Sequence, residues 1–102
     1  MKNITLDKQK LRSFCSANGI SRFALFGSIL TDDFGPESDV DVLVEFEAHV
    51  KMDLLTYVRL ARSIGELFFN GRKVDLVTYK GLRPLLKEAI IQSSEVQYEK
   101  AA

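Results

Sequence analysis

Apolar positions recur with two different spacings along this chain, and the spacings predict alternating helices and strands. Helical spacing indicates amphipathic helices, whereas strict alternation of apolar and polar residues indicates strands. The helical segments are residues 5–18, 53–69 and 83–92, with one helical turn at 29–33. For the segment 53–69 the expected core-facing stripe is Leu54, Leu55, Val58, Ala61, Ile64, Leu67 and Phe68. Asn-Gly pairs at 18–19 and 70–71 end the first two helices, because both residue types tolerate the left-handed backbone.

The clearest strand covers residues 40–46, with the sequence VDVLVEF. Alternation places Val40, Val42, Val44 and Phe46 on one face, and Asp39, Asp41, Leu43 and Glu45 on the other. Further strands are expected at 22–26 and 73–78, and Val96 and Tyr98 suggest a short edge strand near the C-terminus. Helices that alternate with strands predict an α/β fold, in which helices cover a small mixed sheet of three to four strands.

Composition narrows the class of protein. At 102 residues the chain is expected to form a single domain over residues 1–102. Fourteen basic residues cancel fourteen acidic ones, so no direct nucleic-acid binding is expected from net charge. The single cysteine, Cys15, excludes a disulfide framework and fits a reducing compartment. Because neither a secretion signal nor a membrane-spanning run is evident, we expect a cytoplasmic protein.

Three aspartates carry the candidate chemistry. Asp39 and Asp41 lie two residues apart in the best strand, so their carboxylates point to the same side. Asp75 interrupts the apolar strand at 73–78, where an unpaired buried charge would be costly. If the two strands are neighbours, the three carboxylates converge, and such hard oxygen donors suit Mg²⁺ or Mn²⁺. The structural alternatives are a solvated acidic loop, a salt bridge from Asp75 to Lys73 or Arg72, and a position for Asp75 on an edge strand that faces water.

Gly27 and Ser28 follow an apolar strand and precede a helical turn. A glycine there lets an anion approach the backbone, and the free N–H groups with the Ser28 hydroxyl can hold phosphate oxygens. A Gly-Ser pair alone is usually a simple turn. Beside three carboxylates the pair becomes a candidate phosphate-binding turn, because polyphosphate and divalent cations carry opposite charges and bind together. The Lys-Ser/Thr ending of a P-loop is missing, which excludes a P-loop NTPase.

These motifs together resemble the DNA polymerase beta type nucleotidyltransferase superfamily. The resemblance rests on Gly27-Ser28, then ten residues, then Asp39-Val40-Asp41, with Asp75 in a later strand. Within the superfamily the chain is similar to the minimal nucleotidyltransferases, the antitoxin partners of HEPN-domain toxins, over residues 23–91. The resemblance implies a palm-like fold and transfer of a nucleoside monophosphate, in particular AMP, from a nucleoside triphosphate to a hydroxyl.

The resemblance also implies a role for each matching residue. Asp39 and Asp41 would hold two Mg²⁺ ions that carry ATP or another triphosphate, and Asp75 would join the metal nearer the acceptor. Gly27 and Ser28 would grip the outgoing pyrophosphate. One departure from the family pattern concerns Thr31, at a position where many relatives have a basic residue that helps bind phosphate or a partner.

The implied partner is an all-helical HEPN toxin, silenced by adenylylation of a tyrosine in a type VII-like system. A chain this small lacks a second lobe, so a hetero-oligomer or homodimer is expected to complete the cleft. An alternative is an antitoxin that neutralises its partner by stoichiometric binding, and another is transfer to a small-molecule hydroxyl. Secondary candidates are a phosphate-holding role for Arg72, Lys73 and Lys80, and stacking of Tyr79 on a nucleobase.

Overall fold

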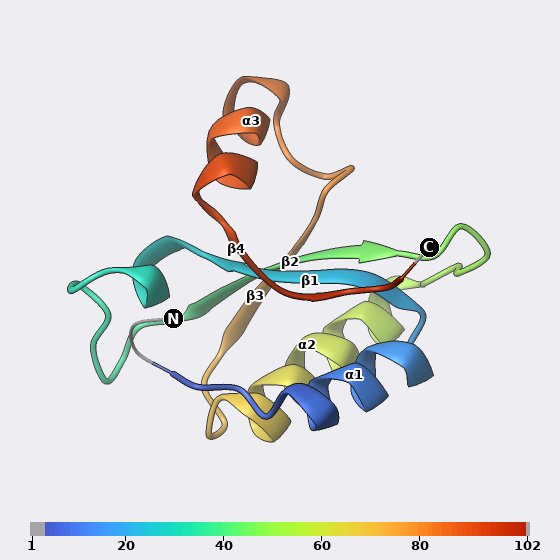
Figure 1. Cartoon of the computed structure of the whole chain (residues 1–102), viewed down its shortest axis with the longest axis horizontal. Coiled ribbons are helices and arrows are strands. Elements are labelled where there is room, and N and C mark those ends of the chain that lie inside the picture. Colours follow the sequence, from blue (N-terminus) through green and yellow to red (C-terminus); the bar gives the residue numbers. More distant parts are fainter. Residues whose placement is uncertain (1–3, 102) are drawn as a thin grey trace.

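The computed structural model describes residues 4–101 and contains one four-stranded mixed sheet with helices on both sides (Figure 1). The elements in chain order are α1 (Lys8–Ala17), β1 (Ile20–Phe26), the 3₁₀ helix η1 (Gly27–Leu30), β2 (Val40–Phe46), α2 (Leu54–Phe68), β3 (Val74–Thr78), α3 (Pro84–Ser93) and β4 (Glu95–Glu99). The expected α/β architecture is therefore confirmed. The expected helical turn at 29–33 lies two residues earlier, as η1, because it begins directly at the glycine that ends β1.

The strand order across the sheet is β3-β2-β1-β4. β1 is antiparallel to both β2 and β4, whereas β2 and β3 are parallel. The parallel pair needs a crossover connection, which α2 provides. β4 is the edge strand that Val96 and Tyr98 suggested, and it pairs with β1. β3 forms the opposite edge of the sheet.

The main hydrophobic core lies between the sheet and the helices α1 and α2 (Figure 1). Val40, Val42 and Val44 point into this core, as the alternation predicted. They meet Leu11 of α1 and Ile64 of α2, both fully buried. Cys15 also packs here, where burial raises the pKa of its thiol to about 12.

The opposite face of the sheet has only a small apolar cluster, to which α3 contributes (Figure 1). Its buried members are Ala24, Leu43 and Tyr79, with Ile90 and Ile91 of α3 packed against them. α3 itself has no fully buried residue among those described. The Tyr79 ring is only 7% exposed and lies under the Arg22 guanidinium, so the expectation that it stacks on a nucleobase is wrong.

Local signals in the sequence define the helix ends. Asp7 caps α1 by accepting hydrogen bonds from the backbone N–H groups of Gln9 and Lys10. Asp53 caps α2 in the same way through Thr56. Pro84 occupies the first turn of α3, where its missing N–H costs nothing. None of the helices within residues 4–101 has the length and apolarity that crossing a membrane requires.

The expected core stripe of α2 is partly wrong. Leu54, Leu55, Val58 and Leu67 are 78%, 59%, 50% and 44% exposed, while Leu60, Ile64 and Gly65 are the buried residues. Apolar residues cover too wide an arc of this helix for spacing alone to select the inner face. Gly65 helps to select it: a Cβ at this position would lie 2.3 Å from the Arg72 carbonyl oxygen. The helix therefore packs against the turn before β3 through its glycine, with Leu54, Leu55 and Leu67 left on its exposed side.

Candidate active site

Asp41 and Asp75 are direct neighbours across the parallel strands β2 and β3. Neighbouring strands lie about 4.8 Å apart, and residues in register point to the same side. Because Val40 and Val42 point into the main core, Asp41 and Asp75 point away from α1 and α2. The sequence analysis predicted that these carboxylates come together only if the two strands are neighbours. The structure confirms that β3 lies beside β2.

The charges of the three aspartates act on one another. Burial raises the pKa of the half-buried Asp41 carboxyl, and the negative charges of Asp75 and then Asp39 raise it further. Asp39 and Asp75 are exposed at the surface around it. A proton or a cation near Asp41 would relieve this repulsion, so the site favours positively charged ligands.

The three aspartates do not form a closed metal-binding cage by themselves. Within residues 4–101, no group of three His, Cys, Asp or Glu side chains has the arrangement that holds a metal ion. The donor set nevertheless fits a hard divalent cation: it contains only carboxylate oxygens, and its central member is penalised by like charge. Assignment of Asp39, Asp41 and Asp75 as metal ligands stays a prediction.

The salt-bridge alternative for Asp75 finds no support. Among the described residues, no ion pair joins Asp75 to Lys73 or Arg72. The edge-strand alternative matches the structure: β3 is an edge strand and Asp75 is exposed, so water solvates its carboxylate and the burial cost expected from the sequence is small. Its carboxylate is therefore available to a ligand.

Gly27 lies directly against the Asp41 carboxylate. Its φ is +77°, and a Cβ built on it would be 2.2 Å from Asp41 Oδ2. Both the backbone conformation and the close approach thus require glycine here. Phe26, the preceding residue, pairs with Asp41 across β1 and β2, which fixes this contact. The structure thereby joins the Gly-Ser turn to the acidic cluster.

Ser28 and Thr31 shape the turn that follows Gly27. The Ser28 carbonyl accepts hydrogen bonds from the Thr31 N–H at 2.9 Å and from the Thr31 hydroxyl at 2.8 Å. The Thr31 hydroxyl also accepts from the Asp33 N–H at 3.1 Å. Ser28 is half-buried beside Gly27. Thr31 therefore closes the short helix through its backbone N–H and its hydroxyl.

Arg72, in the turn before β3, contacts the loop that precedes Asp39, and this contact could not be predicted from the sequence. Its guanidinium donates to the carbonyl oxygens of Gly35 at 2.8 Å and Ser38 at 2.9 Å, and it lies 4.4 Å from the centre of the Phe34 ring. These contacts fix the loop that leads into Asp39. Through Nη1, Arg72 thus holds the backbone before Asp39, while a phosphate-holding role for Arg72 stays a prediction. The contact joins residues far apart in the chain, so spacing gives no signal for it.

Tyr57 on α2 supports the strand that carries Asp75. Its hydroxyl donates a hydrogen bond to the Leu76 carbonyl oxygen, one residue beyond Asp75. Burial raises the pKa of Tyr57, and the charge of Asp75 adds to the increase.

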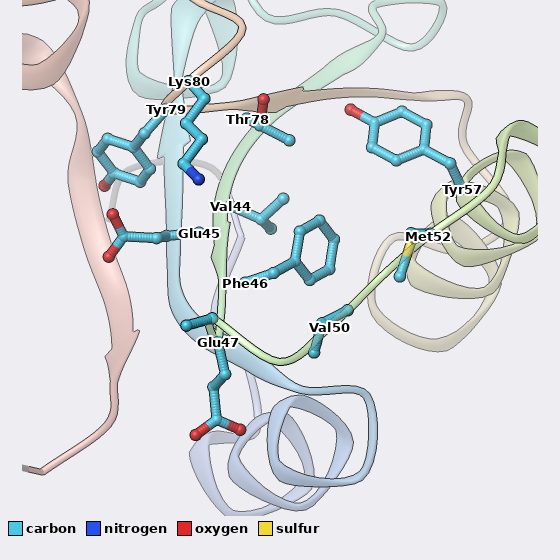
Figure 2. Close-up of a pocket in the computed structure, with 11 residues that line it drawn as sticks. Val44, Glu45, Phe46, Glu47, Val50, Met52, Tyr57, Thr78, Tyr79 and Lys80 are labelled. Carbon is cyan, nitrogen blue, oxygen red and sulfur yellow. The ribbon is translucent and has the colours of Figure 1, made fainter.

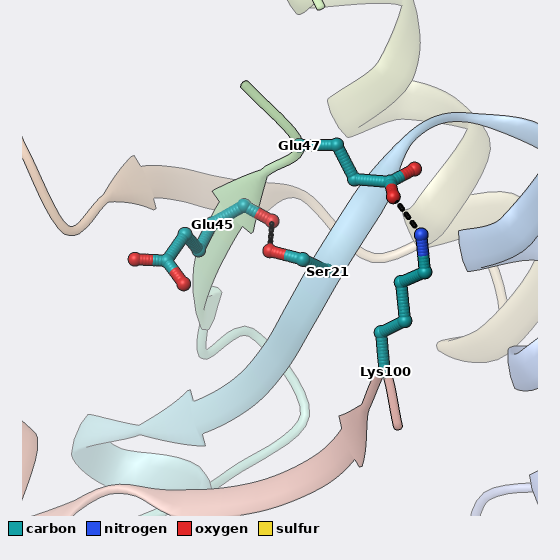
Figure 3. A network of polar contacts seen from close by, with 4 residues as sticks. All are labelled: Ser21, Glu45, Glu47 and Lys100. Carbon is teal, nitrogen blue, oxygen red and sulfur yellow. Dashed lines mark hydrogen bonds and ion pairs between the residues drawn. The ribbon is translucent and has the colours of Figure 1, made fainter. Parts of the chain in front are cut away.

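A cavity, a hydrogen bond and an ion pair lie at the end of β2 opposite to Asp41. A cavity of about 290 Å³ is lined by Val44, Phe46, Met52 and Tyr57, with Lys80 at its border (Figure 2). Nearby, the Ser21 hydroxyl donates to the Glu45 carbonyl, and Lys100 forms an ion pair with Glu47 (Figure 3). The Ser21 contact joins β1 to β2, and the Lys100 ion pair anchors the end of β4. The cavity is lined by β2 residues from Val44 onward and is separated from Asp41 along the strand. His49 is exposed in the loop that follows β2.

Comparison with known proteins identifies relatives of this arrangement. The sequence model of the family described as "Nucleotidyltransferase domain" matches residues 8–96. A Methanocaldococcus jannaschii protein, provisionally named a protein adenylyltransferase, is 35% identical over 92 residues, covering 90% of this chain and 95% of that protein. A solved structure described as a minimal nucleotidyltransferase has 32% identity and a TM-score of 0.69, with 86% of both chains covered.

A further solved structure shares the fold at low sequence identity. It is the complex of a tri-AMPylated Shewanella oneidensis HEPN toxin with its MNT antitoxin. The similarity has a TM-score of 0.62 at 19% identity, and it covers 91% of this chain and 70% of that chain. The likeness establishes the architecture and no more.

Proposed function

This chain belongs to the nucleotidyltransferase domain family, as a minimal nucleotidyltransferase, and from that premise we propose that it transfers AMP from ATP to a hydroxyl of a protein partner. The observation that carries the proposal is the register of Asp41 with Asp75, with Gly27 packed against Asp41. That arrangement combines paired carboxylates with a backbone turn that an anion can approach. ATP as donor also implies a cytoplasmic reaction.

Asp39, Asp41 and Asp75 would hold two Mg²⁺ ions, or Mn²⁺ in their place. Bound metal supplies charge neutralisation for the triphosphate and for the attacking and leaving oxygens. The support for this assignment is chemical: the negative charges of two hard donors, Asp75 and Asp39, disfavour the charged form of the third, Asp41. Arg72 keeps Asp39 in place through the two carbonyls before it.

In the proposed reaction the acceptor oxygen forms a bond to the α-phosphorus of ATP while the bond from that phosphorus to the bridging oxygen breaks. Asp75, exposed at the edge of the sheet, would accept the proton of the acceptor hydroxyl. The Gly27 backbone and the Ser28 hydroxyl would hold the leaving pyrophosphate. Such transfers depend mainly on positioning and charge neutralisation, which a small scaffold can supply.

The proposed partner is a HEPN-domain toxin bound as a hetero-oligomer, and the chain would act as its type VII-like antitoxin. Two comparisons support this proposal. An MNT antitoxin with the same fold was solved in complex with a tri-AMPylated HEPN toxin, and the M. jannaschii relative is named a protein adenylyltransferase. The site itself lies on an open face of the sheet. A partner surface can therefore reach Asp75 directly.

A second candidate function is neutralisation by stoichiometric binding. Thr31 favours it, because its hydroxyl closes η1 where a phosphate-binding cation would otherwise stand. The two functions differ in their dependence on the aspartates. A stoichiometric inhibitor would keep its effect when Asp39 and Asp41 are replaced by Asn, whereas an enzyme would lose it.

The decisive experiment incubates the protein with ATP labelled at the α-phosphate, Mg²⁺ and the HEPN protein encoded beside it. We expect label on the partner, and Asp75→Asn should reduce the rate about 100- to 1000-fold, since metal-assisted charge stabilisation is worth several kcal/mol. Glu45→Gln is the matched control, because Glu45 is exposed on the same sheet face away from the cluster. Absence of transfer by the wild type, or full transfer by Asp75→Asn, would contradict the proposal.

A further inference from the structure

A groove runs along the free edge of the sheet, between α2 and β3. It has a volume of about 570 Å³, and its lining includes Val58, Ala61, Arg62, Lys73, Val74 and Asp75. β3 is the last strand of the sheet on this side, so among the described residues no further strand covers the edge. The groove therefore begins at a candidate catalytic residue and extends along the outer side of α2.

The walls of the groove combine apolar and basic character. Val58 is 50% exposed, and it adjoins Leu54 and Leu55, which are 78% and 59% exposed on the same helix. Arg62 and Lys73 are also exposed, and within residues 4–101 neither forms an ion pair. Three basic residues of the lining, Arg62, Arg72 and Lys73, stand against two acidic ones, Glu66 and Asp75. A metal cation bound to Asp75 would make the net charge of the groove more positive.

The backbone of β3 determines how a neighbouring chain could lie there. The Lys73 carbonyl and the Tyr79 N–H bond to β2, so the odd-numbered residues direct their backbone groups inward. The Leu76 carbonyl points the other way and accepts the Tyr57 hydroxyl. An extended segment beside this edge alternates its side chains between the two faces of the sheet. One side chain would thus lie on the face of Asp75 while its two neighbours enter the groove.

We propose that the α2–β3 groove binds the acceptor segment of the partner protein: an extended stretch whose hydroxyl-bearing residue faces Asp75 and whose flanking residues are acidic and apolar. The acidic side chains complement Arg62 and Lys73, and the apolar ones cover Val58 and its leucine neighbours. This inference rests on the proposed function, since it names the surface by which the protein acceptor is recognised.

The test compares two charge reversals on the same helix. Arg62→Glu changes the groove, whereas Arg59→Glu changes an exposed arginine that borders a separate hollow with Phe14 of α1. We expect Arg62→Glu to raise the KM for the partner protein about tenfold or more, because like charges across an interface are strongly unfavourable. The KM for ATP and the thermal midpoint should not change. Val58→Lys should act in the same direction, and Arg59→Glu should behave as the wild type.

A wild-type KM for the partner in both Arg62→Glu and Val58→Lys would overturn the groove assignment, as would an equal effect of Arg59→Glu. Failure of the proposed function gives a different result. If the wild type binds the partner but transfers no label, catalysis fails, and the dissociation constant for the partner then tests the groove. In that case an unchanged dissociation constant for Arg62→Glu overturns the inference, and a tenfold weaker one supports it.

Discussion

The two faces of the sheet differ in what they do for the protein. The face covered by α1 and α2 buries Phe23, Leu25 and Val42 completely. The other face has a small apolar cluster at its middle and the carboxylates of Asp41 and Asp75 at one end. One strand, β2, contributes to both faces through strict alternation. The buried apolar residues of the first face stabilise the fold. On the second face, repulsion among the aspartates is unfavourable for folding, and the same carboxylates form the candidate ligand site.

In this chain of 102 residues, the residues that stabilise the fold and those of the candidate active site therefore lie on opposite faces of one sheet. Substitutions on the covered face should unfold the protein without acting on the site specifically. Substitutions at the acidic end should change activity while the fold is retained or even stabilised. The following variants test that contrast.

The largest effect on stability is expected from Phe23→Ala on the covered face. Phe23 is 0% exposed in the main core, and deleting such a ring costs about 3–5 kcal/mol of unfolding free energy. The matched variant Leu54→Ala removes a side chain that is 78% exposed and should change the unfolding free energy by less than about 0.5 kcal/mol. Urea denaturation measures both, and equal values would show that the faces are not divided in this way.

A large effect on activity with a moderate effect on stability is expected from Gly27→Ala. The new methyl group would collide with Asp41 Oδ2, in addition to the strain of a positive φ. Gly71→Ala is the control, because Gly71 has a φ of +81° but no atom within 4 Å of the added Cβ. Both should lose about 1–2 kcal/mol of unfolding free energy from backbone strain. Only Gly27→Ala should also lose AMP transfer, and equal activities would contradict the importance of the Gly27 contact.

A smaller and more selective effect is expected from Arg72→Lys. Lysine keeps the charge but lacks the planar fork that reaches the carbonyls of Gly35 and Ser38 together. The loop before Asp39 should loosen, so the dissociation constant for Mn²⁺ should rise about tenfold, as for the loss of other residues that orient metal ligands. Guanidinium ion added to Arg72→Ala should restore part of the affinity. Mn²⁺ binding followed by electron paramagnetic resonance measures this, and wild-type affinity in Arg72→Lys would contradict the positioning role.

The smallest effect concerns the pH dependence of stability without metal. The folded protein raises the pKa of Asp41 above its ordinary value of 3.8, through burial and then through Asp75 and Asp39. Stability from this group is therefore complete below the ordinary pKa and is lost as pH rises through the raised one. Asp41→Asn should slightly increase the thermal midpoint at neutral pH and flatten its pH profile. A lower midpoint for Asp41→Asn than for Glu45→Gln would show that Asp41 does not oppose folding.

Strand β2 shows how much of the fold could be predicted. Its alternation assigned Val42 to the core and Asp41 to the other face before any contact was known, and the structure confirms both. Caps and glycines gave most helix ends. The inner face of α2 could not be predicted, because Leu54 and Val58 are as apolar as the residues that became buried. Packing of Gly65 against the Arg72 carbonyl, a contact made in the tertiary fold, helps to select the rotation of the helix.

The candidate site divides in the same way. Asp41 and Asp75 were identifiable because each places a charge within an apolar strand, and Asp39 because it lies two residues before Asp41. Gly27 and Ser28 became candidates only together with these carboxylates and through the family resemblance. Their use as metal and phosphate ligands stays a prediction. The contacts of Arg72 and Tyr57 were not identifiable, because each joins segments far apart in the chain.

By itself, the sequence determined which residues form strands, which faces those strands present, and which side chains bring charge into apolar surroundings, since alternation and capping act over a few residues. The tertiary structure alone decided that β3 lies beside β2 in the register that pairs Asp75 with Asp41. It also decided that Gly27 packs against Asp41, and that a groove opens beside Asp75. Those outcomes depend on strand order and helix rotation, which the packing of the whole chain selects.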